Sequence, residues 1–232
     1  MTASSSRRKP GLQSRWKDVF DSIESLIPIY EKGSSRISLF SDKGMREEAA
    51  SFAVGGDAGG LVLDLGAGPG TLSRVVARAG GIPVLADASR KMLSKAPEFD
   101  RVQCTFEHLP FRPGTFGAGV AGFALRDAQD LETSLAEIRS AMRTGARLGI
   151  CDLGKPASRV KAMLVGGYVR LVPPLVGFLT AGRLGLGFRS LHITYKLVLD
   201  NVSLGLLLSR YFGTVRIAES KMGAAIVVRC TA

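Results

Sequence analysis

The stretch LVLDLGAGPGT at residues 61–71 places glycines at alternate positions directly behind an apolar run that contains an acid. The acid is Asp64, and the turn that follows it contains Gly66, Ala67, Gly68 and Gly70. Glycine adopts backbone conformations closed to other residues and leaves room for a ligand beside the main chain. In parallel sheets, such a turn between strand and helix binds small molecules at the carboxyl ends of the strands. We therefore expect a small-molecule site, with an ordinary tight turn as the alternative.

The spacing of these residues argues against two phosphate-binding motifs. The third glycine of the dinucleotide fingerprint would fall on Thr71, and the P-loop pattern does not occur. Asp87 ends the next apolar run, where an acid accepts hydrogen bonds from ribose hydroxyls. A carboxylate such as Asp64 suits a zwitterionic amino acid with a sulfonium better than a pyrophosphate. The pattern therefore favours S-adenosylmethionine as the cofactor.

The elements that must position these residues follow from hydrophobic periodicity. From about residue 60, short apolar runs alternate with amphipathic stretches, which predicts an α/β sheet covered by helices on both faces. The expected strands are 61–65, 82–87, 101–106, 117–123 and 146–153, and the expected helices are 71–79, 89–96 and 130–143. Two further strands, joined by a turn within 213–230, close the sheet.

The same segments resemble the class I S-adenosylmethionine-dependent methyltransferases, and specifically the ubiquinone/menaquinone C-methyltransferase family. The segments that carry the resemblance are VFDSIESLIPIYE, VLDLGAGPGTLS, VLADASRKML, EHLPFRPGTF, GFALRDAQD and ICDLGKP. The glycine turn is typical of the whole superfamily, whereas ALRD and LGKP, in order and at the expected distances, favour the quinone family. The resemblance implies a Rossmann-like sheet of seven strands, S-adenosylmethionine as cofactor, and carbon methylation of a prenylated quinol without a metal.

The resemblance also implies which residues form the site. Besides the glycine turn and Asp87, the cofactor-binding residues would be Ala88, Thr105, Phe106, Glu107 and Gly122. Arg126 and Tyr30 would lie beside the acceptor, where Arg126 would stabilise a phenolate and orient a water molecule. A solvated arginine and a core tyrosine are the alternatives. The chain departs from the family at Pro69, Phe106 and Gly122, and it has Arg126-Asp127 where the family has Arg-Asn.

The charge of the chain is concentrated at its flanks. The net charge is +11 over 232 residues, yet residues 18–154 hold fifteen Lys/Arg against eighteen Asp/Glu. Nucleic acid is an unfavoured partner, because neither a Pro-Cys nucleophile nor an Asn-Pro-Pro-Tyr motif occurs. The three cysteines show no C-x-x-C spacing, which argues against a zinc site and for reduced thiols in a cytoplasmic protein.

We expect five segments along the chain. They are a flexible basic tail at 1–17, an N-terminal helical cap at 18–59, a cofactor-binding core at 60–155, an apolar helical lid at 156–212 and closing strands at 213–232.

Charges and prolines shape the expected lid. Only twelve residues, two of them prolines, separate Arg170 from Arg183, which argues against a membrane-spanning helix of ~20 residues. Apolar residues mixed with arginines suit either a lid packed on the protein or peripheral contact with the inner face of an anionic membrane. The acceptor is expected to be lipophilic, a quinol first and a phospholipid amine second. The sequence leaves the oligomeric state open.

Overall fold

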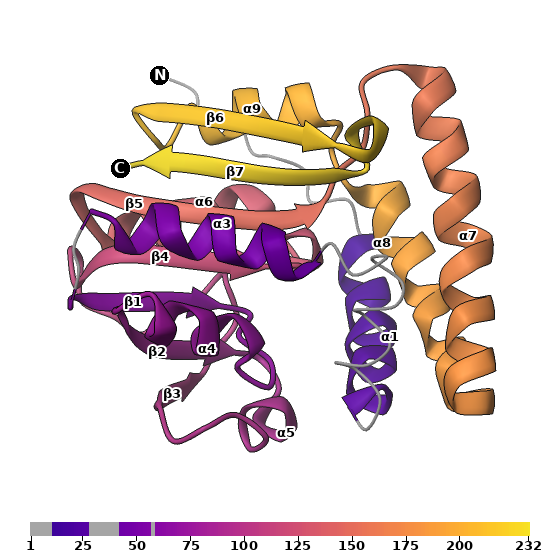
Figure 1. Cartoon of the computed structure of the whole chain (residues 1–232), viewed down its shortest axis with the longest axis horizontal. Helices are drawn as coiled ribbons and strands as arrows, with labels where there is room; N and C mark the ends of the chain where they lie inside the picture. The colour runs from indigo at the N-terminus through magenta and orange to yellow at the C-terminus, as the bar shows by residue number, and fades with distance from the viewer. Residues whose placement is uncertain (1–10, 28–41, 57–58) are drawn as a thin grey trace.

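A seven-stranded mixed sheet forms the frame of the protein in the computed structural model, which describes residues 11–27, 42–56 and 59–232 (Figure 1). The strands are β1 Leu61–Leu65, β2 Ile82–Asp87, β3 Asp100–Gln103, β4 Phe116–Gly122, β5 Met142–Leu153, β6 Thr214–Ser220 and β7 Ala225–Thr231. Their order across the sheet is β3-β2-β1-β4-β5-β7-β6. The strands β1 to β5 are parallel, and β7 runs antiparallel between β5 and β6. The predicted fold class is confirmed.

The strand order creates a crevice beside the glycine turn. The chain builds outward from β1 to β3, then returns to place β4 on the other side of β1. Loops at the carboxyl ends of β1 and β4 therefore leave in opposite directions, which is the place where α/β proteins bind ligands. The turn that follows Leu65 lies at this place.

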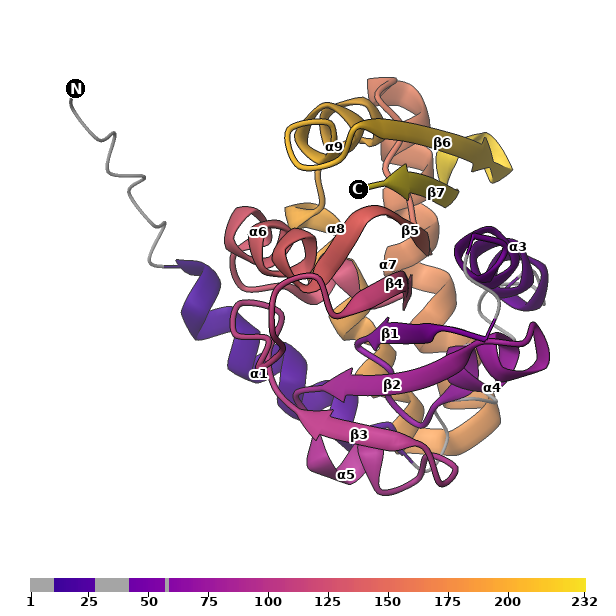
Figure 2. The ribbon, with the colours of Figure 1, turned by 90° about the vertical axis from the view of Figure 1, so that its left-hand side faces the viewer.

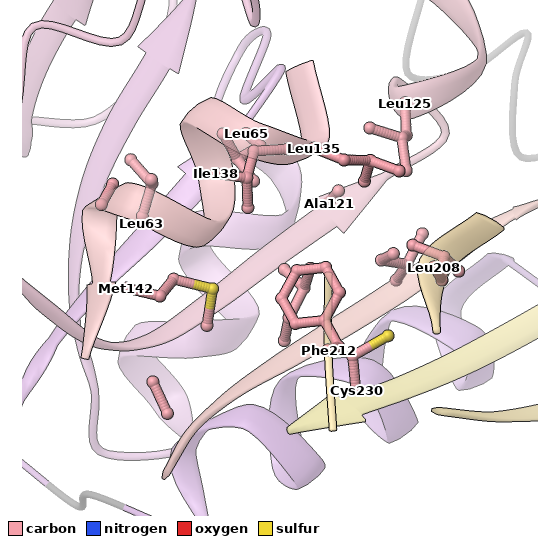
Figure 3. Packing of buried hydrophobic residues seen from close by; sticks show 14 of the residues in the cluster. Leu63, Leu65, Ala121, Leu125, Leu135, Ile138, Met142, Leu208, Phe212 and Cys230 are labelled. Atoms are coloured by element: carbon pink, nitrogen blue, oxygen red, sulfur yellow. The ribbon is translucent and has the colours of Figure 1, made fainter. Parts of the chain in front are cut away.

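Alternation along β1 sends neighbouring side chains to different faces of the sheet. Leu63 and Leu65 join the core cluster shown in Figure 3, whereas Val62 packs in a second cluster on the other face. The first cluster includes the fully buried Leu135 and Ile138 of α6 (Leu131–Ala141). Burial of one such side chain stabilises the fold by roughly 1.5–3 kcal/mol.

Two helices cover the face on which Val62 lies, namely α3 (Asp42–Val54) and α4 (Thr71–Arg78). The inner side of α3 carries alanines, so its backbone lies close to β5. A side chain at Gly149 of β5 would collide with the backbone carbonyl of Ala49. Small residues on both elements thus allow α3 to serve as a sheet-covering helix.

A group of helices stands beyond the carboxyl ends of the strands (Figures 1 and 2). It comprises α1 (Gly11–Ser25), α7 (Arg159–Ala181), the 3₁₀ segment η3 (Gly182–Arg189) and α8 (Ser190–Leu197). The chain reverses between α7 and α8, where the backbones of Gly177 and Gly185 touch. The hydroxyl of Tyr195 donates to the carbonyl of Ala162, 3.1 Å away, and so fastens α8 to α7.

Three of the expected segment boundaries need correction. The expected tail extended to residue 17, but α1 begins at Gly11. The expected cap included α3, which instead packs on the sheet because of its alanine face. The expected lid extended to residue 212, but α9 (Asn201–Leu208) belongs to the main core through Leu207 and Leu208. The lid therefore comprises α7, η3 and α8.

The two prolines expected to interrupt the lid lie inside α7. The stretch Arg159–Leu197 contains a helix that could cross a membrane by length and composition, with mean hydropathy 1.6 and 28% of its most apolar window buried. The sequence-based prediction that this stretch contains no helix long enough to cross a membrane is therefore wrong. In the structure α7 packs along η3 and α8 and is a wall of a cavity described below.

Candidate active site

The glycine turn after β1 adopts the backbone conformation that its composition predicts. Gly66, Gly68 and Gly70 have φ of +65°, +54° and +76°, values that residues with side chains rarely adopt. A Cβ at Gly68 would meet no described atom within 4 Å, so the main chain there borders open space. A Cβ at Gly66 would collide with Ala124.

Asp87 ties the end of β2 to this turn. Its Oδ2 accepts the backbone N–H of Gly68 at 2.8 Å, and its Oδ1 accepts that of Ser89 at 2.7 Å. Burial raises the pKa of Asp87, and the two N–H donors oppose this effect. Each carboxylate oxygen can accept more than one hydrogen bond, so Asp87 can also accept from a ligand.

The turn and Asp87 border a cavity of about 100 Å³, the cofactor cavity below. The residues that line this cavity include the following predicted cofactor-binding residues: Gly66, Gly68, Asp87, Ala88, Thr105, Phe106 and Glu107. The helix α1 adds Trp16, Val19, Phe20, Ile23 and Glu24. The structure therefore brings most of the predicted cofactor residues around one space.

Four predicted cofactor residues do not line this cavity. Ala67 packs with Leu85 and Leu93, and Gly70 is the residue before α4. Gly122 lies against the guanidinium of Arg46. The fourth, Asp64, lies on the face of β1 that α3 and α4 cover.

Asp64 is 1% exposed and forms a buried polar pair with α4. The hydroxyl of Ser73 donates to its Oδ2, while Oδ1 has no hydrogen-bond partner among the described residues. Burial raises its pKa to about 7, against the opposing effects of Ser73 and the nearby Arg46. Its place in the structure is that of a buried group behind the turn, and direct cofactor contact stays a prediction.

A second cavity of about 470 Å³, the acceptor cavity below, adjoins the first, and Val19, Ile23, Phe123 and Asp127 line both. Its walls are apolar and come from α1, α3, α7, η3 and α8. Its charged lining residues are Asp42, Arg46, Arg126, Asp127, Asp152 and Lys221. It is therefore an apolar chamber that carries a group of charges.

Arg126 is held by a buried ion pair. Its guanidinium donates to Asp152 Oδ1, and both side chains are less than a tenth exposed. Its Nε lies 3.8 Å from Asp127 Oδ1. The structure thus brings Arg126 to the acceptor cavity as a paired group, not as a solvated arginine. Tyr30 lies outside the described residues.

Three features of the site were not expected from the sequence. Trp16 and Phe20 of α1 stack with ring centroids 4.9 Å apart. Glu24, one turn further along, accepts from Ser89 Oγ at 2.6 Å and Lys91 Nζ at 2.7 Å, which fastens α1 beside Asp87. The apolar spacing of residues 16–26 is helical and signals the helix, but not its docking place. Arg46 gave no signal, because only folding brings α3 beside β4.

The residues around the cofactor cavity fit S-adenosylmethionine in chemistry. The open backbone at Gly68 and the carboxylate of Asp87 suit its polar part, and Phe106 offers a flat apolar face. The volume of about 100 Å³ is below the roughly 300 Å³ of a typical ligand site. Side chains of α1, among them Trp16 and Phe20, form part of the lining of this small cavity.

Comparison with known proteins agrees with this geometry. A methyltransferase domain family matches residues 63–150. The demethylmenaquinone methyltransferase of Mycobacterium sp. strain KMS is 31% identical over 159 residues, which are 68% of this chain and 69% of the relative. That of Thermobifida fusca is 33% identical over 65% of this chain and 68% of the relative. The chain belongs to the class I S-adenosylmethionine-dependent methyltransferases.

Solved structures share the fold of this methyltransferase. A possible histamine N-methyltransferase from Thermotoga maritima has a TM-score of 0.59 at 14% identity, covering 90% of this chain and 98% of its own. The 1,6-didemethyltoxoflavin-N1-methyltransferase of Burkholderia thailandensis, solved with S-adenosylhomocysteine, has a TM-score of 0.57 at 13% identity, covering 100% and 92%. The predicted enzyme class and cofactor are confirmed. When bound, S-adenosylmethionine supplies an activated methyl group, so this methyltransferase must position an acceptor and exclude water.

Proposed function

We propose that this methyltransferase methylates a ring carbon of a prenylated quinol. The observation that carries the proposal is the acceptor cavity, whose apolar walls and charged residues adjoin the cofactor cavity. The ring hydroxyls of a quinol would lie beside Arg126 and Asp127, with its isoprenoid tail along the apolar walls. The names of the curated relatives support the same acceptor class.

Burial of the tail favours a prenylated acceptor over a soluble one. Apolar surface transferred from water contributes ~25 cal/mol per Å². The walls available for it include Leu164, Val165, Val169, Pro173 and Leu191. A soluble catechol lacks this contribution, so longer tails should lower KM until the cavity is full.

We also propose that the outer face of α7 contacts an anionic membrane at its cytoplasmic side. Met163, Leu171 and Leu179 are 70%, 68% and 73% exposed, which makes an apolar surface on a helix that also lines the acceptor cavity. Residues 159–197 hold six Lys/Arg and no Asp or Glu. Such a surface suits anionic lipid, from which a lipophilic acceptor can enter.

The experiment that tests the acceptor measures transfer of labelled methyl from S-adenosylmethionine. A demethylmenaquinol, a demethoxylated benzoquinol, a soluble catechol and phosphatidylethanolamine are compared at equal concentration in detergent. Methyl transfer to a ring carbon of a quinol, located by mass spectrometry, is expected. Transfer to the phospholipid amine alone would replace the quinol with another lipid and retain the enzyme class.

A further inference from the structure

Asp127 stands where the cofactor and acceptor cavities meet. It is the last residue of the 3₁₀ turn Leu125–Asp127 that follows β4, and it lines both cavities. Its side chain is 18% exposed, while its Oδ1 is buried and has no hydrogen-bond donor among the described residues. The carboxylate therefore lines the reacting space with part of its surface accessible, and no hydrogen bond to a described residue occupies its Oδ1, so it can accept a proton.

We propose that Asp127 is the general base that removes the phenolic proton of the acceptor. This proposal rests on the proposed function, because the proton to be removed belongs to a ring hydroxyl of the quinol. An asparagine, which the quinone family has at this position, cannot accept a proton at neutral pH. The role is therefore specific to the aspartate of this chain.

The carboxylates nearby are less available than Asp127. Asp152 Oδ1 accepts from Arg126 and from the backbone N–H of Leu153. Glu107 Oε1 accepts from the backbone N–H groups of Gln129 and Asp130 and from the hydroxyl of Ser134. Asp87 holds two backbone donors, as described above. Arg126 stays protonated and cannot act as a base.

The surroundings of Asp127 set its proton affinity in the range useful for catalysis. The pKa of Asp127 is raised to about 6, chiefly by burial; the charge of Arg126 opposes this effect, and the charges of Asp152 and Asp87 add to it. The other charged groups that line the two cavities are Glu24, Asp42, Arg46, Glu107 and Lys221. A base whose pKa lies near the working pH is largely deprotonated there and still binds a proton strongly enough to remove it from the acceptor.

The O–H bond of the acceptor breaks, and its proton moves to the carboxylate of Asp127. The electron pair left on oxygen reaches the adjacent ring carbon, which bonds to the methyl group while the electron pair of the S–CH₃ bond stays on sulfur. The same ring carbon then loses its hydrogen as a proton, and the aromatic hydroxyl re-forms with the proton held by Asp127. One proton is released to solvent in total.

The test compares Asp127→Asn with the wild type and with Asp200→Asn. Asp200 is the N-cap of α9 outside both cavities, and asparagine caps a helix equally well. We expect Asp127→Asn to lower kcat roughly 100-fold at pH 7. The rate of the wild type should rise with pH near pH 6, and this rise should be absent from Asp127→Asn. The activity of the variant should recover only as pH approaches the pKa of the acceptor hydroxyl, ~10. Calorimetric affinity for S-adenosylhomocysteine should be unchanged.

A carboxyl NMR titration of the protein without ligands gives a second readout. One resonance missing from Asp127→Asn should titrate near pH 6, and a pKa at the ordinary value of an aspartate would overturn the proposal. Parallel loss of cofactor affinity and rate would place Asp127 on the cofactor instead, and an unchanged pH profile would remove the base role.

Two further outcomes separate the proposals. No transfer by the wild type to any quinol overturns the proposed function, and the base role with it. If Asp127→Asn does not fold, Asp127→Glu must keep the pH dependence at reduced kcat.

Discussion

Asp87 accepts hydrogen bonds from the backbone at the glycine turn, and it is also predicted to bind the cofactor. We predict that Asp87→Ala weakens S-adenosylmethionine about a hundredfold, because loss of two hydrogen bonds to a carboxylate costs on the order of 3 kcal/mol. Isothermal calorimetry measures the affinity, and a thermal melt checks that the turn still folds without the acceptor of the Gly68 N–H. Unchanged affinity would show that Asp87 only supports the turn.

The buried carboxyl of Asp64 makes the free energy of unfolding depend on pH. Its pKa is raised from 3.8 to about 7 in the folded protein. Its stabilising contribution is therefore complete below about pH 4 and is lost as pH rises through about 7, and Asp127, raised to about 6, acts in the same direction. We predict that the free energy of unfolding in urea falls by on the order of 2 kcal/mol between pH 5 and 8 through Asp64, and that Asp64→Asn removes this part while the contribution of Asp127 remains. Equal losses in both proteins would contradict this.

A single substitution of Arg126 changes stability as well as activity, so it cannot by itself show a role in turnover. We predict that Arg126→Ala lowers the melting temperature, because it leaves the buried carboxylate of Asp152 without its cation, a loss of roughly 3–5 kcal/mol. The double variant Arg126→Ala with Asp152→Asn should recover much of this stability while turnover stays low. Recovery of activity together with stability would show that Arg126 has a structural role only.

At the scale of elements, α1 lines the cofactor cavity, and we predict that it controls access to this cavity. The chain has one tryptophan, Trp16, and it lines that cavity. We predict that its fluorescence changes when S-adenosylhomocysteine binds, and that stopped-flow dissociation becomes several-fold faster in Glu24→Ala. The matched control is Lys91→Ala, since an exposed partner of the same carboxylate contributes little. Dissociation rates equal to that of the wild type would show that α1 does not close the cavity.

The lid helix depends on small residues as well as apolar ones. Gly177 of α7 and Gly185 of η3 touch through their backbones, so the chain can fold back tightly and bring α8 against α7. The prolines at 173 and 174 are buried within α7 and line its inner side. Several apolar side chains of α7, among them Leu171, Leu175 and Leu179, remain exposed.

For the whole molecule, the exposed face of α7 should decide membrane association. We predict that the wild type sediments with vesicles of phosphatidylcholine and phosphatidylglycerol at low salt and less at high salt. Leu171→Asp with Leu179→Asp should abolish sedimentation without lowering the melting temperature, because both side chains are exposed. The control is Ile82→Asp, an apolar residue 52% exposed at the start of β2. Equal loss of sedimentation in the control would contradict the prediction that the exposed face of α7 binds the membrane.

The amino-acid sequence by itself determined the features that depend on local geometry. Alternating apolar runs specified the strands of the sheet, because a strand repeats every two residues. The glycines at 66, 68 and 70 specified a turn with positive φ, because other residues rarely adopt it. Together with Asp87 they specified the cofactor class.

Only the tertiary structure decided where these groups point and what they meet. Asp64 shares the face of Val62, which α3 and α4 cover, so it lies behind the turn and not in the cavity. The pairing of Arg126 with Asp152 joins the 3₁₀ turn after β4 to β5, two segments that are distant in sequence. The position of Asp127 between two cavities depends on α1, α7 and α8 packing at one end of the sheet. Such contacts follow from side-chain packing between distant segments, which local periodicity does not encode.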